Sequence, residues 1–238
     1  MTPPVSLQTL GGLTLRVDGE NITGAVTQRR RLALLVLLAA AGDRGLPRDK
    51  VLALLWPDAP EERARHALAQ QLYAQRLNLG LEELFLGTKT LRLNPAVMQT
   101  DLDEYNGAVS RGELAVAARV YQGPFLDGVH LGVGDEFERW QDGERDRLAR
   151  TQGGVLEGLA AGATGAGDAP AAAEWWRRRL DLEPANTRVA TETVRALMAA
   201  GDRAGAIRVG EAHQRLLQTD LGLPADPDLA SRLASLRL

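Results

Sequence analysis

The sequence predicts a mainly α protein in two parts. Residues 1–98 are expected to form an α+β winged helix-turn-helix, and residues 99–238 an all-α domain of TPR-like helical repeats. Three observations carry this prediction. Within the first hundred residues, the spacing of apolar residues changes from the alternation of a strand to the period of a helix, and then back to alternation. A short glycine motif recurs at a spacing of 34 residues in the second part. The two parts also carry net charges of opposite sign.

The first segment is expected to form short strands. Apolar and polar residues alternate from Leu13 to Val17, which is the period of a half-buried strand. Asp18-Gly19 favours a turn into Asn21-Ile22. Gly11-Gly12 separates these strands from an earlier one over Val5–Leu10.

Two helices are predicted next. Leucines repeat at helical spacing from Thr27 onward, behind the basic run Arg29–Arg31, and Gly42 ends this helix. A second helix covers about Asp49 to Trp56, and its tryptophan is expected in the core. The Pro-bounded residues 57–60 then force a tight turn.

A third helix and a hairpin complete the first part. The helix begins at Glu61-Glu62, where acids suit a helix N-terminus, and runs to about Leu79 with Gly80 as its C-cap. Residues 84–93 are expected to form a hairpin that turns near Gly87. Two helices joined by a tight turn, with a hairpin behind them, are typical of a winged helix-turn-helix.

From about Met98 onward the sequence is expected to be helical throughout. Gly112-Glu113, Gly167-Asp168 and Gly201-Asp202 each precede small residues by the same spacing, and the last two lie 34 residues apart. That is the period of a tetratricopeptide helix pair, in which small residues let helices approach closely. The low-complexity stretch 160–169 is expected to be a loop.

Composition and charge narrow the function classes. Residues 1–98 hold 12 Lys and Arg against 9 Asp and Glu, a net charge of +3, whereas residues 99–238 have a net charge of −6. A basic head on an acidic body suits a nucleic-acid reader. The chain has no cysteine, its N-terminus does not resemble a signal peptide, and its longest apolar run is too short for a membrane span. We therefore expect a cytoplasmic, nucleoid-associated protein without membrane contact.

The sequence offers no sign of an enzyme. It contains no G-x-S-x-G, phosphate-binding loop or H-E-x-x-H motif, and no cluster of metal ligands, so we expect no catalytic residues, cofactor or metal. The histidines at 66, 130 and 213 lie far apart in the sequence. His130, with Asp127 and Asp135 nearby, is explained more simply as a loop residue.

Several stretches of the chain resemble the SARP-type activators, which join an OmpR/PhoB-like winged helix to a bacterial transcriptional activation domain. In the first part the resemblance rests on residues 10–22, 29–58 and 64–76. In the second it rests on residues 100–105, GPFL within 118–128, and 201–207 running on to LGLPADPDL at 221–229. The resemblance implies a head that binds promoter direct repeats through its third helix, and a body that mediates dimer contacts and engages RNA polymerase. Double-stranded DNA, RNA polymerase and a second copy of the chain are the expected partners.

The third helix is expected to carry the DNA contacts. Its inward stripe is Ala64, Ala67, Leu68 and Leu72. Amide side chains read adenine and arginines bind guanine or phosphate, so each polar residue receives a role. Base reading is assigned to Gln70, Gln71 and Tyr73. Phosphate contact is assigned to Arg65, His66 and Arg76 on the same helix, and to Arg48 and Lys50 on the second helix. Lys89 at the hairpin tip is expected to reach the adjacent minor groove as the wing.

The end of the third helix departs from the family pattern. Related proteins end it with a leucine and consecutive basic residues, whereas this chain has Gln75 at the apolar position and Ala74 and Leu77 in place of cations. The loss of roughly two phosphate contacts flattens the salt dependence by about two units of log–log slope. An alternative therefore stays open: an interaction adaptor whose head has weak or lost DNA binding and whose helical repeats bind a partner.

Overall fold

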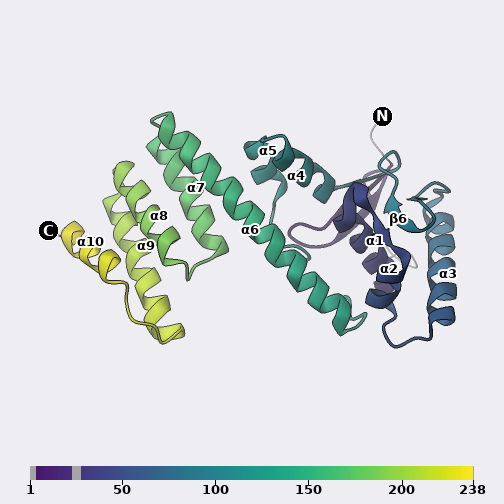
Figure 1. The fold of residues 1–238 in the computed structure, drawn as a ribbon. Coiled ribbons are helices and arrows are strands. Elements are labelled where there is room, and N and C mark those ends of the chain that lie inside the picture. The colour runs from purple at the N-terminus through teal and green to yellow at the C-terminus, as the bar shows by residue number, and fades with distance from the viewer. Residues whose placement is uncertain (1–3, 23–27, 238) are drawn as a thin grey trace. The chain divides into compact units, whose positions relative to one another are not determined.

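The computed structural model describes residues 4–22 and 28–237, and its contacts divide the chain into two compact units, Met1–Leu148 and Ala149–Leu238 (Figure 1). The predicted start of the first helix, Thr27, lies outside the described residues. The division falls inside one long helix, α6 (Asp135–Gly165).

The N-terminal strands form a four-stranded sheet in the order β3-β2-β1-β7. Its strands are β1 (Val5–Gln8), β2 (Thr14–Val17), β3 (Glu20–Asn21) and β7 (Met98–Thr100). The first three confirm the predicted strands, with Asp18 and Gly19 at positive φ in the turn. The prediction of helix from Met98 onward is wrong at β7, which pairs in parallel with β1, Val5 opposite Met98. Met98 and Thr100 are buried while Gln99 is exposed, the alternation of a half-buried strand.

Three helices follow with nearly the predicted bounds, α1 (Arg29–Ala41), α2 (Arg48–Leu55) and α3 (Glu61–Leu79). The centre of α1 is fully buried from Ala33 to Ala39, as its apolar run requires. Gly80 adopts the left-handed conformation after α3, at φ 65°, which makes it a glycine C-cap. Trp56 is only half-buried, so the prediction of a core tryptophan is wrong. It follows α2 as the C-cap residue and lines a surface groove.

A three-stranded sheet packs behind these helices in the order β4-β6-β5, from β4 (Leu46–Pro47), β5 (Phe85–Leu86) and β6 (Thr90–Leu93). Antiparallel β5 and β6 confirm the predicted hairpin, with Gly87 at φ 87° in its turn. A Cβ at Gly87 would lie 2.0 Å from the carbonyl oxygen of Thr90, so only glycine fits this tight turn.

The segment after β7 is built into the first unit. It contains α4 (Asp101–Ser110), α5 (Leu114–Val120) and the irregular residues 121–134, which again correct the prediction of continuous helix. The Asp101 carboxylate accepts hydrogen bonds from the backbone N–H groups of Thr9 and Leu10, both at 2.7 Å, and from the Thr9 hydroxyl at 2.9 Å. Burial raises the pKa of Asp101, although these hydrogen bonds act in the opposite direction.

The GPFL stretch closes over the end of β1. Leu10 and Phe125 form a bridge and are both fully buried, and Leu126 donates its N–H to the Thr9 carbonyl at 2.8 Å. A Cβ at Gly123 would lie 2.9 Å from the Cα of Gly11, so the two backbones meet at a distance that only glycine allows. The motif singled out in the sequence is therefore a packing element of the N-terminal sheet.

The second unit continues α6 with α7 (Ala169–Leu182), α8 (Thr187–Ala199), α9 (Arg203–Arg215) and α10 (Pro227–Arg237), and a π-helical turn, Leu216–Asp220, follows α9. The loop expected over residues 160–169 is confined to residues 166–168, because α6 continues to Gly165 and α7 begins at Ala169. The alanines of this stretch favour helix, and Thr164 donates its hydroxyl to the Ala160 carbonyl at 2.8 Å.

The repeated glycine motif marks equivalent corners of the repeat. Gly167 and Gly201 have φ values of 76° and 78°, and the aspartate after each caps the next helix, Asp168 for α7 and Asp202 for α9. Ala173 and Ala206 belong to the buried core of this unit, together with Val194 and Leu197. The 34-residue period thus produces the close helix pairing that was predicted from it.

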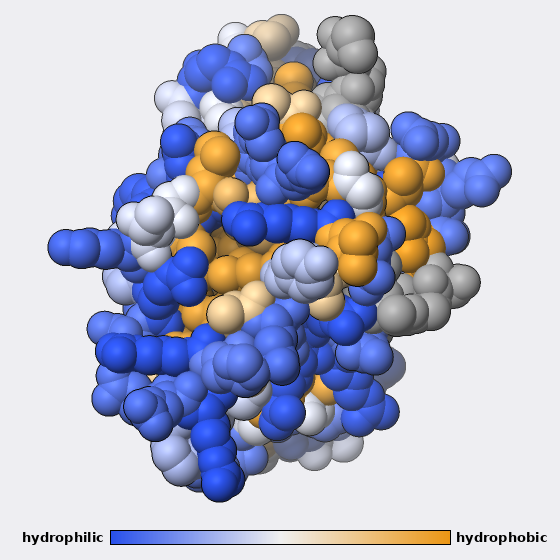
Figure 2. Space-filling view, turned by 90° about the vertical axis from the view of Figure 1, so that its right-hand side faces the viewer, coloured by the Kyte–Doolittle hydropathy of each residue, from blue (hydrophilic) through white to orange (hydrophobic). Residues whose placement is uncertain are grey.

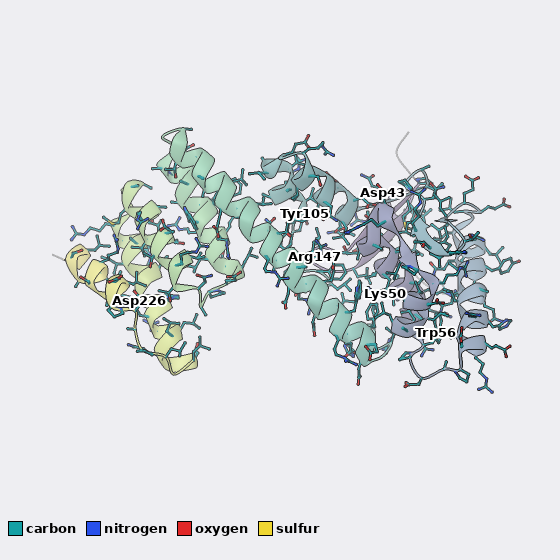
Figure 3. All side chains as sticks on the ribbon, viewed as in Figure 1. Asp43, Lys50, Trp56, Tyr105, Arg147 and Asp226 are labelled. Atoms are coloured by element: carbon teal, nitrogen blue, oxygen red, sulfur yellow. The ribbon has the colours of Figure 1, made fainter. Side chains whose placement is uncertain are left out.

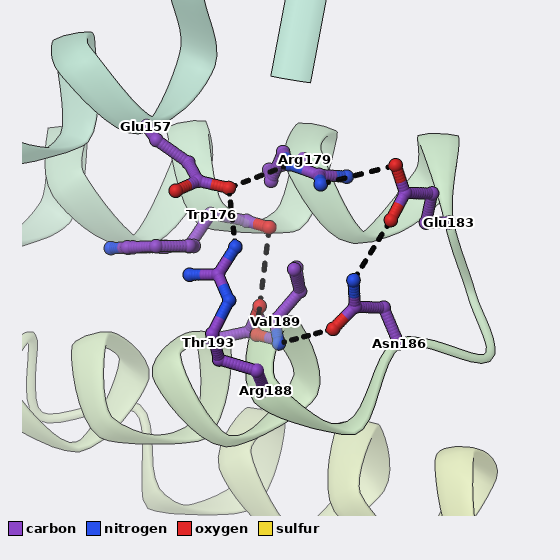
Figure 4. A network of polar contacts seen from close by, with 8 residues as sticks. All are labelled: Glu157, Trp176, Arg179, Glu183, Asn186, Arg188, Val189 and Thr193. Carbon is purple, nitrogen blue, oxygen red and sulfur yellow. Dashed lines mark hydrogen bonds and ion pairs between the residues drawn. The ribbon is translucent and has the colours of Figure 1, made fainter. Parts of the chain in front are cut away.

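A buried arginine organises the contact between α6, α7 and α8 (Figure 4). The Arg179 side chain is 7% exposed, and it donates to Glu157 at 3.0 Å and forms an ion pair with Glu183 at 3.2 Å. Arg188 contacts the same Glu157 oxygen at 2.6 Å. Carboxylates on two sides let a guanidinium be buried at this position.

Gly153→Ala is expected to destabilise the second unit even though alanine is the better helix former. A Cβ at Gly153 would lie 3.0 Å from Arg179 Nε and 3.1 Å from its Cζ, and the two carboxylates hold that guanidinium in place. Gly154→Ala is the matched control, because its Cβ would meet nothing within 4 Å. We expect Gly154→Ala to stabilise by up to about 1 kcal/mol, and Gly153→Ala to be about 2 kcal/mol less stable than this control, measured by thermal unfolding. Equal shifts in the two variants would contradict the packing argument.

The same cluster is expected to make stability depend on pH. Burial acts to raise the pKa of Glu157, but hydrogen bonds from Arg188 and Arg179 outweigh it and hold the pKa below the ordinary 4.5. The hydrogen bond from Asn186 is the main cause that lowers the pKa of Glu183. Groups with a lowered pKa stabilise the fold above their unfolded pKa and lose this contribution as the pH falls. We expect unfolding monitored below about pH 4.5 to lose stability more steeply in the wild type than in Glu157→Gln.

Candidate nucleic-acid interface

Helix α3 separates a buried side from an exposed one. Ala64, Leu68 and Leu72 are buried and Ala67 is half-buried, which confirms the predicted inward stripe. Gln75 is fully buried at the apolar position where the sequence placed it, and its amide donates to the Arg31 carbonyl at 3.3 Å. The exposed side of α3 is therefore well defined by the residues packed beneath it.

Four predicted contact residues of α3 lie on its exposed side: Arg65, His66, Gln70 and Tyr73. His66 and Gln70 are one turn apart and share a hydrogen bond, Nε2 to Nε2, at 2.9 Å. Arg65 pairs with Glu61, and both side chains are more than half exposed. Because exposed ion pairs contribute little free energy, a DNA phosphate can replace Glu61 as the partner of Arg65 at a small cost in stability. Figure 2, which views the molecule from the side where α3 lies, shows a mainly hydrophilic face with hydrophobic residues gathered near its middle.

Two predicted contact residues turn away from this face. Arg76 is half-buried, its guanidinium lies 5.9 Å from the centre of the Phe85 ring, and it reaches the Phe85 carbonyl at 3.5 Å. The Arg76 side chain is therefore directed toward the hairpin strand β5 and not outward, because the ring and the carbonyl of Phe85 contact its guanidinium. Gln71 is also half-buried, with its Oε1 buried among α3's neighbours, so it is poorly placed to read bases.

Three of the predicted cations meet beside α3. A groove of about 450 Å³ is lined by residues of α2, α3 and the hairpin, among them Arg48, Arg65 and Lys89. Arg48 donates to the Thr88 carbonyl, and its backbone N–H donates to the Lys89 carbonyl at 3.1 Å, which ties the start of α2 to the hairpin tip. Residues separated widely in the sequence thus form one cationic patch, Arg48–Arg65–Lys89. Lys50 lies on α2 (Figure 3). It is exposed and is not among the residues that line this groove.

Two exposed residues of α3 were missed by the sequence reasoning. Leu77 is 67% exposed, close to the 68% of Tyr73. Arg63 is exposed and lines a second groove with Trp56 and Arg30. The signal for Leu77 was present in its spacing, because Tyr73 and Leu77 stand four residues apart and share a helix face.

A metal site is another kind of site that histidine and carboxylate side chains can form. Within residues 4–22 and 28–237, no group of three or more His, Asp or Glu residues is arranged to hold a metal ion. His130 forms an exposed pair with Glu138 at 3.3 Å rather than with Asp127 or Asp135. Across the same residues, no helix combines the length and apolar character that crossing a membrane requires.

Comparison with known proteins identifies the second part of the chain. The family model of the bacterial transcriptional activator domain matches residues 96–237. The solved structure of Mycobacterium tuberculosis EmbR in complex with a low affinity phosphopeptide has a similar fold, with a TM-score of 0.64 at 19% sequence identity. The alignment covers 98% of this chain and 65% of the EmbR chain, so this chain spans about two thirds of that protein's length. None of the curated proteins matches the chain.

Proposed function

The chain belongs to the bacterial transcriptional activator domain family, as a transcription regulator of the SARP type, and we propose that it activates transcription by binding promoter direct repeats through α3 and the hairpin. The observation that carries this proposal is the meeting of Arg48, Arg65 and Lys89 in one groove beside the exposed side of α3. Cations at the edge of a helix position it on the phosphates, while polar side chains on the helix read base edges.

The roles of the two sequence regions follow from the family. We assign DNA contact to residues 1–98 and the activating contacts to residues 99–238, a division that differs from the compact units because residues 99–148 pack with the N-terminal region. The net charge of −6 in residues 99–238 suits a contact with cationic surfaces of RNA polymerase. We place the protein in the cytoplasm, associated with the nucleoid.

A homodimer is part of the proposal, because direct repeats present two equal half-sites. The adjacent tryptophans Trp175 and Trp176 of α7 would be natural candidates for such a contact, but both are half-buried, and the Arg178 guanidinium lies 4.9 Å from the centre of the Trp175 ring. The dimer contact therefore has no support at these tryptophans. Light scattering on free and DNA-bound protein tests it, and a free species of 25.6 kDa together with a complex of one chain per duplex would contradict it.

Genomic DNA selection with the purified full chain tests the proposed function. We expect enrichment of a direct repeat whose halves are about 10 base pairs apart, because equivalent helices then enter the same face of the duplex. Recovery of unrelated fragments, with no shared repeat, would contradict specific recognition.

A protein-interaction adaptor is the second candidate function, and the exposed Tyr73 and Leu77 favour it, since exposed apolar side chains are typical of protein contacts. Retention on nonspecific duplex at low salt separates the two candidates. A DNA-binding protein is retained and Arg65→Ala elutes earlier, whereas an adaptor shows equal, weak retention in both forms.

A further inference from the structure

The most exposed line of α3 carries no lysine or arginine. His66, Gln70, Tyr73 and Leu77 follow each other at spacings of four, three and four residues, so they share one helix face. All four are exposed, and Tyr73 and Leu77 are the large apolar side chains that project furthest into solvent in the described part of the first unit. The last turns of this face are therefore apolar.

Cations flank this line on both sides. Arg65 lines the groove shared with α2 and the hairpin, whereas Arg63 lines a separate groove shared with Trp56 and the start of α6. The lining of this second groove balances three arginines against three carboxylates, so on that side Arg63 itself, exposed on α3, is the cation next to the line. Phosphates of the two strands border a major groove in the same way, with the base edges between them. The placement of charge thus suits a duplex with its base edges against the line His66–Leu77.

We infer that Tyr73 and Leu77 read thymine, by contact with the C5 methyl groups that thymines present in the major groove. This inference rests on the proposed DNA-binding function. The C5 methyl is the apolar group of the base edges in that groove, and an apolar side chain distinguishes it from the polar edges of other bases. The apolar end of α3 then contributes to sequence specificity, because it contacts bases where cationic side chains would have contacted phosphates.

The inference predicts the composition of the bound site. Thymine is expected at one or two fixed positions of each half-site, under the C-terminal half of α3. Replacing such a thymine by deoxyuridine removes only the methyl group and leaves base pairing and charge unchanged. Burial of one methyl-sized group corresponds to about fourfold in affinity, so each critical substitution is expected to weaken binding about fourfold.

The experiment compares duplexes of the selected site that carry thymine or deoxyuridine at each thymine in turn, with affinities measured by fluorescence anisotropy. The proteins are the full-length wild type, Leu77→Ala, Tyr73→Ala and Leu77→Met. Leu223→Ala is the control, since Leu223 is 51% exposed and belongs to the second unit. We expect the loss of affinity caused by deoxyuridine to persist in the control and in Leu77→Met. In Leu77→Ala this loss should nearly disappear at one thymine, and in Tyr73→Ala it should nearly disappear at a neighbouring thymine.

Three results would overturn the inference. The first is a selected site that has no thymine under α3. The second is tight binding that is unchanged when deoxyuridine replaces thymine, which is the result expected if Tyr73 and Leu77 bind a protein instead. A deoxyuridine effect of equal size in wild type, Leu77→Ala and Tyr73→Ala excludes these two side chains as the readers. Absence of any duplex binding by the wild type at low salt is a different outcome, which removes the proposed function and this inference together.

Discussion

Replacing Arg48, Arg65 and Lys89 together by alanine is expected to weaken duplex binding about a thousandfold at low salt. Each side chain lines the same groove beside α3, and loss of a charge-assisted phosphate contact corresponds to about 1.5 kcal/mol, or roughly tenfold in affinity. The slope of log affinity against log salt is expected to become shallower by about 2.7, since each phosphate contact contributes about 0.9. Anisotropy titrations over a range of salt concentrations measure both quantities.

The matched control for this variant removes the same charge elsewhere. Arg195, Arg208 and Arg232 are exposed and belong to the second unit, so their triple alanine variant has the same net charge as the test variant. We expect its salt slope to stay close to that of the wild type. Equal losses in the two variants would show that net charge alone governs binding and that the cationic patch has no special role.

A fragment that ends at residue 98 is expected to lack a cooperative unfolding transition, whereas a fragment of residues 1–148 is expected to unfold cooperatively. The shorter fragment loses the Asp101 carboxylate that binds Thr9 and Leu10, and it loses the buried Phe125 that covers the end of β1. Unpaired backbone groups and exposed apolar surface then remain at the N-terminal sheet. Circular dichroism during heating distinguishes the two outcomes.

A milder change in the full chain checks the same contacts. Asp101→Ala removes three hydrogen bonds at once, and we expect it to destabilise the first unit by about 3 kcal/mol. A cooperative transition in the 1–98 fragment, together with a small effect of Asp101→Ala, would contradict the view that residues 99–148 complete the N-terminal fold.

The local elements of the fold were predictable from the sequence because their signals are local. Proline and glycine bound α3 at Pro60 and Gly80, and both bounds of that helix agree with the prediction. The hairpin and the 34-residue glycine motif are also encoded within a few residues. Strand β7 was missed because it is short and its partner β1 lies more than ninety residues earlier in the sequence. A pairing over that distance leaves no periodic pattern in the residues of β7 itself.

The candidate site was only partly predictable, for a reason that Arg76 illustrates. A helical projection places Arg76 outward, but its guanidinium finds the ring and the carbonyl of Phe85 on a strand that the projection does not include. The same limitation applies to Trp56, whose size suggested the core while its position at the end of α2 left it half-buried. The joining of Arg48, Arg65 and Lys89 required the tertiary fold.

Site-specific crosslinking shows whether the exposed face of α3 enters a groove of the duplex. The chain contains no cysteine, so Gln70→Cys introduces a unique attachment point for a photoreactive group on that face. We expect a crosslink to bases of the selected duplex from position 70, and none from the same group placed by Gly154→Cys in α6. A crosslink from position 154 with none from position 70 would contradict this expectation.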